Sequence, residues 1–391
     1  MLNKKSKCLY CGNAPTNHFV SFCMQTIMVS LAPLSKIGNY FDTSFSREAM
    51  RIIFIPYLTT FKLLGLLSYN RNPERATTER SKVIWLEAQK RGIEMEQLMI
   101  LKKPIDQYRA KIKGKWRYFE SIPIPPNLND KSYSWMDDKW KLKKFFEKRG
   151  IPVPRGERMV SLIQLDYIFG KLDKPLITKP ELGSRGRHTT THIYTKEDLV
   201  HGYKVAKKLC HFLIVEEMLF GSVYRATYVG GKIAGVLRGD PPRITGDGKN
   251  NIEHLIEEKN KNKHEGVKDV IVDKKTIEFL DRQNFHLQTI LPQGKTIDLS
   301  EKIGVSYGGN AVEMIEKISP DILEELKKAG DVLNTPLVGF DFIIPDPTKK
   351  ASDQKWGIIE ANSLPFINLH HFPLEGKPQN VAGKIWDLWE I

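Results

Sequence analysis

Gly339-Phe340-Asp341 and Ile358-Ile359-Glu360-Ala361-Asn362 are two short stretches near the end of the chain that combine apolar residues with acids. Apolar runs surround them, from Val338 to Ile344 and from Trp356 to Ile359. Runs of this length predict β-strands, so both stretches are expected to lie on a strand or at its end. The C-terminal part of the chain is therefore predicted to carry acidic side chains on a sheet.

Three polar side chains of these strands make a candidate metal site. In an extended chain, residues two apart point to the same face, so Glu360 and Asn362 can offer oxygen atoms to one ion. Asp341 from a neighbouring strand would complete a three-oxygen cluster of the kind that Mg²⁺ prefers. Taken alone, the pattern is more typical of strand-end acids that face solvent, and that alternative stays open.

A glycine-bearing loop follows the strand predicted from Leu176 to Lys179. It reads Gly183-Ser184-Arg185-Gly186-Arg187-His188-Thr189-Thr190. Glycines let backbone N–H groups approach a phosphate, and arginines and hydroxyls add charge and donors. The loop lacks the Gly-Lys-Ser/Thr ending of a P-loop and the spacing of the dinucleotide fingerprint, so a surface loop with two arginines is an equal alternative.

Two further segments could contact a nucleotide or a substrate. Val215-Glu216-Glu217-Met218-Leu219 leaves a predicted strand and could present backbone amides to an adenine edge; the alternative is a plain turn.

Tyr224 to Leu237 alternates around Gly230-Gly231 and predicts a β-hairpin. Arg225 and Arg238 lie on its two arms and would bind a substrate carboxylate if they share a face. The sequence leaves that open because the register of the turn is unknown.

The composition is that of an ordinary soluble protein with a basic surface. The chain has 391 residues, of which 41% are hydrophobic and 27% charged, and a formal net charge of +14. This length predicts two or three packed subdomains. The charge favours nucleotides, acidic peptides or other polyanions as partners, with a merely solvated basic surface as an equal alternative. Aromatic residues are not interleaved with the basic runs, so nucleic acid ranks last among these partners.

No secretory signal and no membrane span are expected. The apolar stretch from Ile52 to Tyr69 contains Pro56 and Lys62, and a lysine at the centre of a membrane span would be costly. No apolar region with a small-residue cleavage site follows the N-terminus. We therefore expect a cytoplasmic protein in which this stretch is a buried helix or a partner-binding segment.

Four candidate metal ligands lie close together near the N-terminus. Cys8 and Cys11 have Cys-x-x-Cys spacing, and His18 and Cys23 follow them. This Cys₃His set has the ligand types of a structural Zn²⁺ site, although it is more tightly spaced than a common zinc finger. Ordinary reduced thiols or a redox pair are the alternatives. Cys210 lies in an apolar run and is expected in the core.

Taken together and in order, these residues resemble the ATP-grasp superfamily, in particular the branch of cyanophycin synthetase and the bifunctional glutamate–cysteine ligase/glutathione synthetase. The resemblance runs from about residue 81 to the end and leaves residues 1–80 unmatched. Its motifs, in chain order, are Arg91-Gly92-Ile93, Asp138-Lys139, Gly150 to Pro154, Lys179-Pro180, the 183–190 loop, Val215-Glu216-Glu217, Gly221, Tyr224-Arg225, Gly230-Gly231-Lys232, Arg238, Gly246 to Lys249, Asn260, Gly339-Phe340-Asp341, Ile359 to Asn362, Pro365, His370 and Gly376.

The resemblance implies an α/β (α+β) protein with the ATP-grasp fold, in which two α+β lobes clasp ATP. An appended N-terminal region at 1–80, holding the candidate zinc ligands, and a small α/β domain at 81–135 would come first. The ATP-grasp domain would follow at 136–391, with lobes at 136–215 and 216–391. Ligases of this fold often pair, so a homodimer or homotetramer stays open.

The resemblance also implies roles for individual residues. The ATP phosphates would be held by Lys139 and Lys179 and by the loop residues Gly183, Ser184, Arg185 and Gly186. The adenine site would be lined by the hinge residues Glu216, Glu217 and Met218. Two Mg²⁺ would be bound by Asp341, Glu360 and Asn362, and the acyl-phosphate would be steadied by Arg238 with Arg225.

The implied activity is ATP-dependent ligation of a carboxylate to an amine through an acyl-phosphate, with a small molecule or an acidic peptide as substrate. Three departures from the family leave an ATP-binding regulatory or scaffold protein with a decayed site as the alternative. Val223 stands where the family has an acid that meets the ribose, and Phe366 follows Pro365 where the family has glycine. The loop reads Gly186-Arg187-His188 where the family has Gly-x-Gly-Val.

Overall fold

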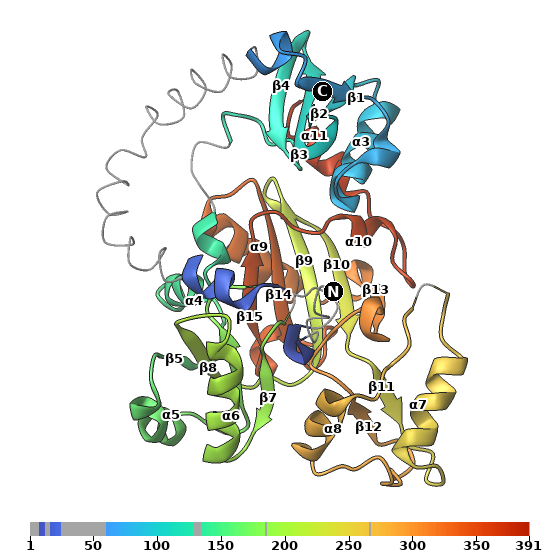
Figure 1. The fold of residues 1–391 in the computed structure, drawn as a ribbon. Coiled ribbons are helices and arrows are strands. Elements are labelled where there is room, and N and C mark those ends of the chain that lie inside the picture. The colour runs from blue at the N-terminus through green and yellow to red at the C-terminus, as the bar shows by residue number, and fades with distance from the viewer. Residues whose placement is uncertain are drawn as a thin grey trace, which may run out of the picture.

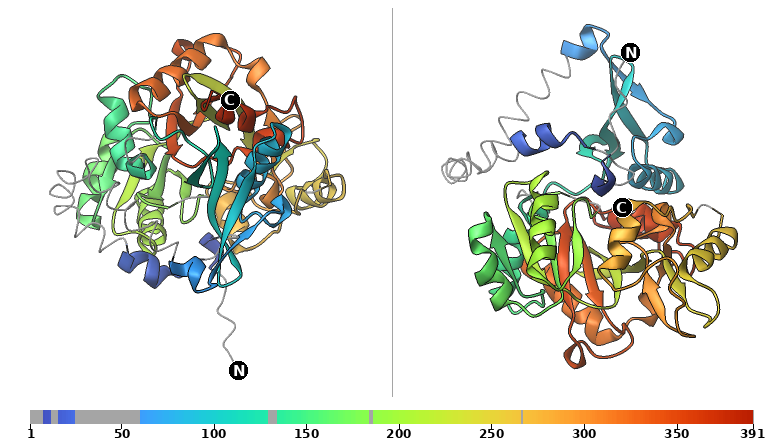
Figure 2. Two further views of the ribbon diagram at one scale, coloured as in Figure 1. Left: turned by 90° about the horizontal axis from the view of Figure 1, so that it is seen from above. Right: turned by 60° about the horizontal axis from the view of Figure 1, so that its bottom comes forward.

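The computed structural model describes residues 8–11, 16–24, 60–128, 134–183, 186–265 and 267–390. Within these ranges the chain forms a small domain and two lobes, each built on an antiparallel sheet (Figure 1). The small domain stands to one side of the two lobes (Figure 2). Among the described residues, no helix combines the length and the apolar character that crossing a membrane requires.

The small domain has a four-stranded sheet in the order β1-β2-β3-β4, covered by helix α3 (Glu79–Lys90). Helix α3 begins at Thr78, whose side chain accepts a hydrogen bond from the amide of Ser81, and ends before Gly92, which has a φ of +68°. The strands are β1 (Leu67–Asn70), β2 (Met95–Ile100), β3 (Lys103–Ile112) and β4 (Lys115–Glu120).

The sheet of the small domain begins earlier in the chain than residue 81. Strand β1 lies within the segment 1–80 that we assigned to the N-terminal region, and it pairs with β2 along its whole length. The C-terminal helix α11 (Val381–Asp387) also packs in this core, where the indole of Trp386 donates a hydrogen bond to the carbonyl of Ile84 at 3.0 Å. Residues 302 positions apart in the chain thus meet in one core, which no local sequence pattern reveals.

The first lobe is a four-stranded sheet in the order β5-β8-β6-β7 with helices packed against it. Its core joins the sheet to helices α5 and α6. Helix α4 was expected in this lobe, but its Leu142 and Phe146 lie in the core of the second lobe with Phe340, and it packs against strand β15. The elements of this part of the chain are α4 (Lys139–Glu147), β5 (Gly156–Met159), α5 (Leu165–Lys171), β6 (Leu176–Pro180), β7 (Thr190–Ile193), α6 (Lys196–Lys207) and β8 (Leu213–Glu217).

The second lobe is a five-stranded sheet in the order β13-β10-β9-β14-β15, with a small satellite of two strands and two helices. Strands β9 and β10 form a hairpin whose turn residues Gly230 and Gly231 have φ values of +53° and +88°, as a tight two-residue turn requires. The elements are β9 (Ser222–Val229), β10 (Lys232–Asp240), β11 (Arg243–Thr245), α7 (Ile252–Lys261), α8 (Lys274–Asp281), β12 (Thr296–Asp298), β13 (Asn310–Glu313), α9 (Pro320–Leu333), β14 (Leu337–Ile344), β15 (Gly357–Asn362) and α10 (Asn368–His371).

Most elements predicted from local patterns are confirmed. The helices expected at 81–90, 139–149 and 381–389 form as α3, α4 and α11, and the strands expected at 176–179, 212–215, 338–344 and 356–359 form as β6, β8, β14 and β15. The apolar stretch from Ile52 to Tyr69 is different. Residues 52–59 lie outside the described residues. Residues 60–63 are helical but not buried as expected, since Leu63 is 84% exposed, and Leu67 to Tyr69 pair with β2 as part of β1.

Candidate active site

Neighbouring strands of the second lobe bring the predicted acidic residues together. Asp341 on β14 lies opposite Glu360 on β15 and opposite Arg225 on β9, while Gly339 lies opposite Asn362. Residues that lie directly opposite one another in a sheet share a face, as do residues two apart along a strand. The side chains of Arg225, Asp341, Glu360 and Asn362 therefore leave the sheet on the same side.

Arg225 and Asp341 form a bidentate ion pair. The Nε and Nη2 atoms of the arginine each donate to one carboxylate oxygen at 2.7 Å. Both side chains are mostly withdrawn from solvent. Burial alone would lower the pKa of Arg225, but the charge of Asp341 outweighs it and raises that pKa. A carboxylate has further lone pairs, so Asp341 can accept both hydrogen bonds and still coordinate an ion.

Glu360 faces the first lobe. Its Oε2 atom lies 3.7 Å from the Nζ atom of Lys139, the first residue of α4. Lys139 also donates a hydrogen bond of 2.5 Å to the carbonyl of Gly183, at the start of the glycine loop. Burial, followed by the nearby charge of Asp341, raises the pKa of Glu360 above its ordinary value. A bound cation would relieve this unfavourable charge.

The polar set fits a magnesium ion. Asp341, Glu360 and Asn362 offer two carboxylates and one amide, which are hard oxygen donors. The side-chain amide nitrogen of Asn362 is buried and has no hydrogen-bond partner among the described residues. Buried polar groups normally have a partner, so this amide is poised for a group that the protein alone does not supply.

A second lysine and a buried acid continue the site into the first lobe. Lys179 of β6 lies 2.6 Å from Glu216 of β8, and Lys143 of α4 lies 3.1 Å from the same carboxylate. Burial alone would raise the pKa of Glu216, but the two lysines outweigh it and lower that pKa. Lys179 also donates to the carbonyl of Ile359 at 3.4 Å, next to Glu360. Sequence reasoning missed Lys143, because only the fold brings α4 against β8.

The hinge segment that contains Glu216, Glu217 and Met218 makes more ion pairs and backbone hydrogen bonds than the sequence indicated. The side chain of Glu216 is engaged by lysines, and that of Glu217 by Arg155 at 3.0 Å and Lys355 at 2.8 Å. The backbone amides of Glu217 and Met218 each donate to a backbone carbonyl of the first lobe, at 2.9 Å. These two amides are therefore not available to an adenine edge, whereas the amide of Leu219 has no partner among the described residues.

The two hairpin arginines do not share a face. Arg225 lies opposite Leu237, and Arg238 lies opposite Tyr224. Their guanidinium groups therefore leave the sheet on opposite sides, which corrects the arrangement in which both would bind one substrate carboxylate. The Nε atom of Arg238 lies 2.9 Å from Asp240 on its own strand. Only Arg225 joins the acidic cluster.

The chain is similar to known proteins in sequence and in fold. No family model matches the chain. The chain is 28% identical over 260 residues to the cyanophycin synthetase of Synechocystis sp., covering 64% of this chain and 30% of that protein. It is 28% identical over 262 residues to the glutathione biosynthesis bifunctional protein GshAB of Clostridium perfringens, covering 65% and 34%. The structure is similar to a bifunctional glutathione synthetase from Pasteurella multocida, with a TM-score of 0.51, 21% identity, and coverage of 80% of this chain and 44% of that one.

The chain has the ATP-grasp fold. Its similarity in sequence to cyanophycin synthetase and GshAB matches the resemblance drawn from its motifs. The chain spans about a third of the length of the curated relatives that it matches. The ATP-grasp lobes of this chain are the sheets that carry Lys179 and Asp341, and the acidic cluster lies where the two lobes meet.

The glycine loop of the ATP-grasp domain is only partly described. Ser184 and Arg185 lie outside the described residues. Gly183 and Gly186 have φ values of +126° and +56°, which are backbone conformations that favour glycine. The carbonyl of Gly186 accepts a hydrogen bond of 2.5 Å from Lys302 of the second lobe, so the loop reaches across to that lobe.

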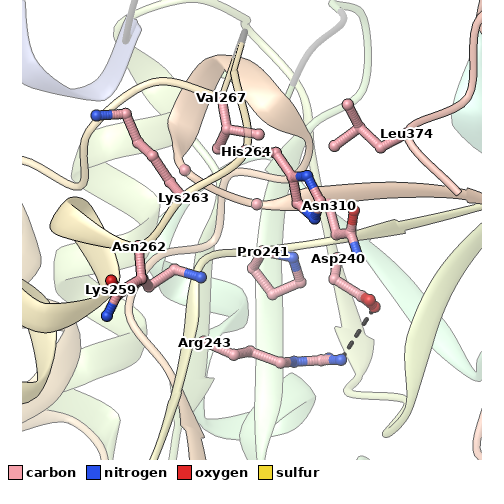
Figure 3. Close-up of a pocket in the computed structure, with 12 residues that line it drawn as sticks. Asp240, Pro241, Arg243, Lys259, Asn262, Lys263, His264, Val267, Asn310 and Leu374 are labelled. Carbon is pink, nitrogen blue, oxygen red and sulfur yellow. Dashed lines mark hydrogen bonds and ion pairs between the residues drawn. The ribbon is translucent and has the colours of Figure 1, made fainter.

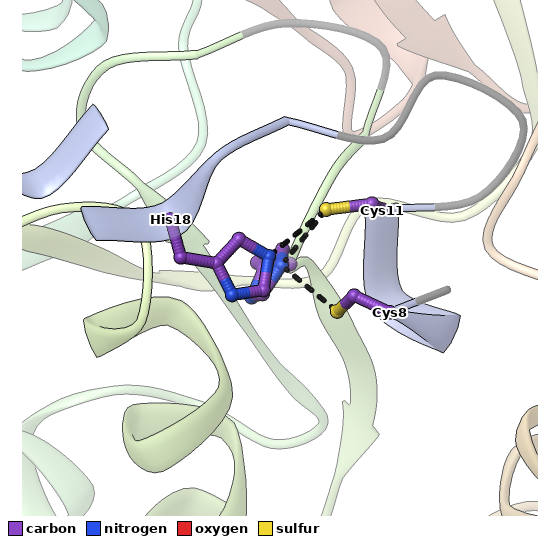
Figure 4. Close-up of side chains that lie close together, drawn as sticks. Cys8, Cys11 and His18 are labelled. Atoms are coloured by element: carbon purple, nitrogen blue, oxygen red, sulfur yellow. Dashed lines mark hydrogen bonds between the residues drawn. The ribbon is translucent and has the colours of Figure 1, made fainter. Parts of the chain in front are cut away.

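The N-terminal cysteines meet the glycine loop of the ATP-grasp domain. Cys8, Cys11 and His18 lie together with His188, and their potential ligand atoms are all within 4.8 Å of one another (Figure 4). Cys23, which the sequence placed in this set, does not belong to the group, and His188 takes its position. The only signal for His188 in the sequence was its departure from the Gly-x-Gly-Val pattern. Cys210 is buried, as expected for a core residue.

A cavity of about 320 Å³ lies at the end of β10, the strand that carries Arg238 (Figure 3). Its lining includes four residues that carry or can carry positive charge, and Asp240 opposes them. Arg243 is paired with Asp240 at 3.0 Å and with Asp298 at 2.5 Å, whereas Lys259 has no ion pair among the described residues. Burial lowers the pKa of Lys259. The four lining residues that carry or can carry positive charge are Arg243, Lys259, Lys263 and His264.

Proposed function

We propose that the protein is an ATP-dependent ligase that joins a carboxylate to an amine through an acyl-phosphate. The observation that carries this proposal is the approach of Lys139 of α4 and of Lys179 of the first lobe to Glu360 and the carbonyl of Ile359 in the second lobe. Two cations and an oxygen-rich cluster thus face one another, as binding of a nucleotide triphosphate with a metal ion requires.

The roles of the residues follow from their charges and positions. Lys139 and Lys179 would bind phosphate oxygens, and the backbone of Gly183 and Gly186 would cover them. Asp341, Glu360 and Asn362 would hold Mg²⁺, which offsets the charge of the transferring phosphoryl group when bound. The adenine would meet the hinge after Met218, since the amides of Glu217 and Met218 are already bonded.

The reaction has two steps. A carboxylate oxygen of the substrate attacks the γ-phosphorus of ATP, and the bond between that phosphorus and the β–γ bridging oxygen breaks, which releases ADP. An amine then attacks the acyl carbon, inorganic phosphate leaves, and the amine gives up a proton. Lys139 and Lys179 stabilise negative charge in the first step, so positioning and electrostatics supply most of the rate.

An acidic substrate is favoured by the charge of the chain and by the cavity at the end of β10. The formal net charge is +14, and the cavity is lined by Lys259, Lys263 and His264 among others. A positive potential raises the local concentration of anionic substrates. We propose an amino acid, a small molecule or a short peptide rich in aspartate or glutamate.

A phosphate-release screen tests the function. The purified chain is incubated with Mg–ATP and with amino acids, dipeptides and acidic peptides, and products are weighed by mass spectrometry. A product whose mass is the sum of the two substrates less one water supports the ligase. If the chain binds ATP but forms no product in any mixture, the result favours the alternative, an ATP-binding regulatory protein with a decayed site. Val223 and the altered glycine loop are the features that support this alternative. Glu360→Gln is the matched negative control.

A further inference from the structure

Four potential metal ligands, two cysteines and two histidines, converge where the N-terminal segment meets the first lobe (Figure 4). Cys8 precedes the turn η1 (Leu9–Cys11) and Cys11 ends it. His18 begins the helical segment 18–24, and His188 lies just before β7. The ligands come from two parts of the chain that are about 170 residues apart in sequence. Only the tertiary structure brings them together.

Three sulfur–nitrogen distances in the cluster are close to those of a tetrahedral site. The Sγ atom of Cys11 lies 3.2 Å from Nε2 of His18 and 3.4 Å from Nε2 of His188. The Sγ atom of Cys8 lies 3.6 Å from Nε2 of His188. Zinc–sulfur and zinc–nitrogen bonds of ordinary length at a tetrahedral angle place sulfur about 3.5 Å from nitrogen. The side chains are therefore already spaced as the ligands of one ion.

His188 is held in the orientation that a ligand needs. Its side chain is fully buried, and its Nδ1 atom lies 2.7 Å from the carbonyl of Val205, so Nδ1 carries the proton and the lone pair of Nε2 faces the two sulfurs. The residue has a φ of +54°, which is rare for a non-glycine residue, and its amide donates to the carbonyl of Tyr10 at 3.1 Å. The surrounding structure thus fixes both the backbone and the ring.

Hydrogen bonds alone do not account for the cluster. Both sulfurs of Cys8 and Cys11 approach Nε2 of His188, but one lone pair accepts one proton. A cation at the centre would bond to all four ligand atoms at once. Two thiolates would also balance the charge of a divalent ion, which makes a buried site neutral.

We propose that Cys8, Cys11, His18 and His188 bind one Zn²⁺, and that this ion fastens the N-terminal segment to the loop that carries Gly183 and Gly186. Thiolate and imidazole ligands in a closed tetrahedral set are those of structural zinc sites. The fourth ligand is His188, not Cys23. The zinc assignment stands on these four side chains and does not depend on the proposed ligase activity.

The fastened segment contacts both lobes. The carbonyl of Tyr10 accepts from the amide of His188 in the first lobe and from Lys302 of the second lobe at 3.5 Å. The hydroxyl of Tyr10 donates to Glu278 on α8 of the second lobe at 2.9 Å. A metal ion that holds Cys8, Cys11 and His18 to His188 should therefore restrain the separation of the lobes.

Metal analysis of the full chain tests the site. Wild-type protein, saturated with zinc and then desalted, should retain about one zinc per chain, and Cys11→Ser and His188→Ala should retain less than about a fifth of that. Cys23→Ser is the matched control, because it removes a nearby thiol outside the cluster, and should retain the full amount. Absence of bound zinc in the wild type, full zinc in His188→Ala, or equal loss in Cys23→Ser would each overturn the proposal.

Spectroscopy of the wild-type chain loaded with Co²⁺ tests the site even if a variant fails to fold. Wild-type chain loaded with Co²⁺ should show the intense visible absorption of a tetrahedral ion and a thiolate charge-transfer band, and X-ray absorption on the zinc form should give two sulfur and two nitrogen neighbours. Octahedral spectra, or a shell with three sulfurs, would contradict the assignment. Because both readouts are independent of turnover, a missing ligase activity would leave them unchanged.

Discussion

Arg225 and Asp341 lie directly opposite one another on β9 and β14, and the guanidinium group holds both oxygens of the carboxylate at 2.7 Å. Asp341 lies opposite Glu360 on the other side, so the pair belongs to the acidic cluster. The two hydrogen bonds do not use all the lone pairs of the carboxylate. We therefore propose that Arg225 positions a metal ligand, which differs from the substrate contact expected from the sequence.

Breaking this pair should reveal its energetic coupling. Arg225→Met leaves a buried carboxylate without its partner and should lower the free energy of unfolding by about 3–5 kcal/mol. Asp341→Asn should be destabilising as well, but the double variant should lose less than the sum of the two by at least about 1 kcal/mol. Urea denaturation of the wild type, the two single variants and the double variant gives the four free energies of unfolding in this double-mutant cycle. Strictly additive losses would show that the two groups do not depend on each other.

Replacing Glu360 should separate activity from stability. Glu360→Gln removes a carboxylate from the candidate magnesium site and should lower ADP formation by about 100-fold or more. Since burial raises the pKa of Glu360, its charge is unfavourable in the free protein, so the variant should unfold at the same or a higher urea concentration. Glu324→Gln, an exposed acid on α9, is the control and should leave both quantities unchanged. Wild-type turnover in Glu360→Gln would refute the site assignment.

Glu216 should matter more for stability than its partner Lys143. Glu216→Gln leaves two buried lysines without their shared counter-charge and should cost about 3–5 kcal/mol. Lys143→Met should cost less, because burial already lowers the pKa of Lys143 and the pair of Glu216 with Lys179 at 2.6 Å remains. Thermal and urea unfolding rank the two variants. The reverse order would mean that Lys143, not Lys179, is the main partner of this carboxylate.

Acid should loosen the contact between the C-terminal helix and the rest of the protein. The Nε2 atom of His371 accepts a hydrogen bond from the amide of Ala382, at the start of α11, at 3.1 Å. Burial, and to a lesser extent the neighbouring His370, lowers the pKa of His371 to about 4, below its ordinary value of 6.5. The unfolded chain therefore binds the proton more tightly, and this contribution to stability is lost as pH falls from about 6.5 to about 4.

Hydrogen exchange of α11 as a function of pH checks this prediction. Protection of the helix should fall over that window in the wild type, and the fall should be smaller in His371→Gln, which keeps an acceptor that does not titrate. His254→Gln alters an exposed histidine on α7 and should behave as the wild type. A pH profile that is identical in His371→Gln and the wild type would exclude His371 as the cause.

The sequence alone determined the strands, the hairpin and the relation of Glu360 to Asn362, because apolar runs, paired glycines and the two-residue repeat of a strand are local properties. It also placed Asp341, on a predicted neighbouring strand, among the candidate metal ligands. The order of motifs along the chain was enough to predict the ATP-grasp fold. Each of these inferences depends on residues that are neighbours in sequence or on their order.

Only the tertiary structure decided which side chains meet across long distances. The register of the hairpin placed Arg225 and Arg238 on opposite faces, the packing of α4 brought Lys143 to Glu216, and the path of the N-terminal segment replaced Cys23 by His188. The physical reason is common to all three. A contact between remote segments depends on strand register and on the packing of whole elements, and a shift of one residue in a strand reverses the face of every side chain.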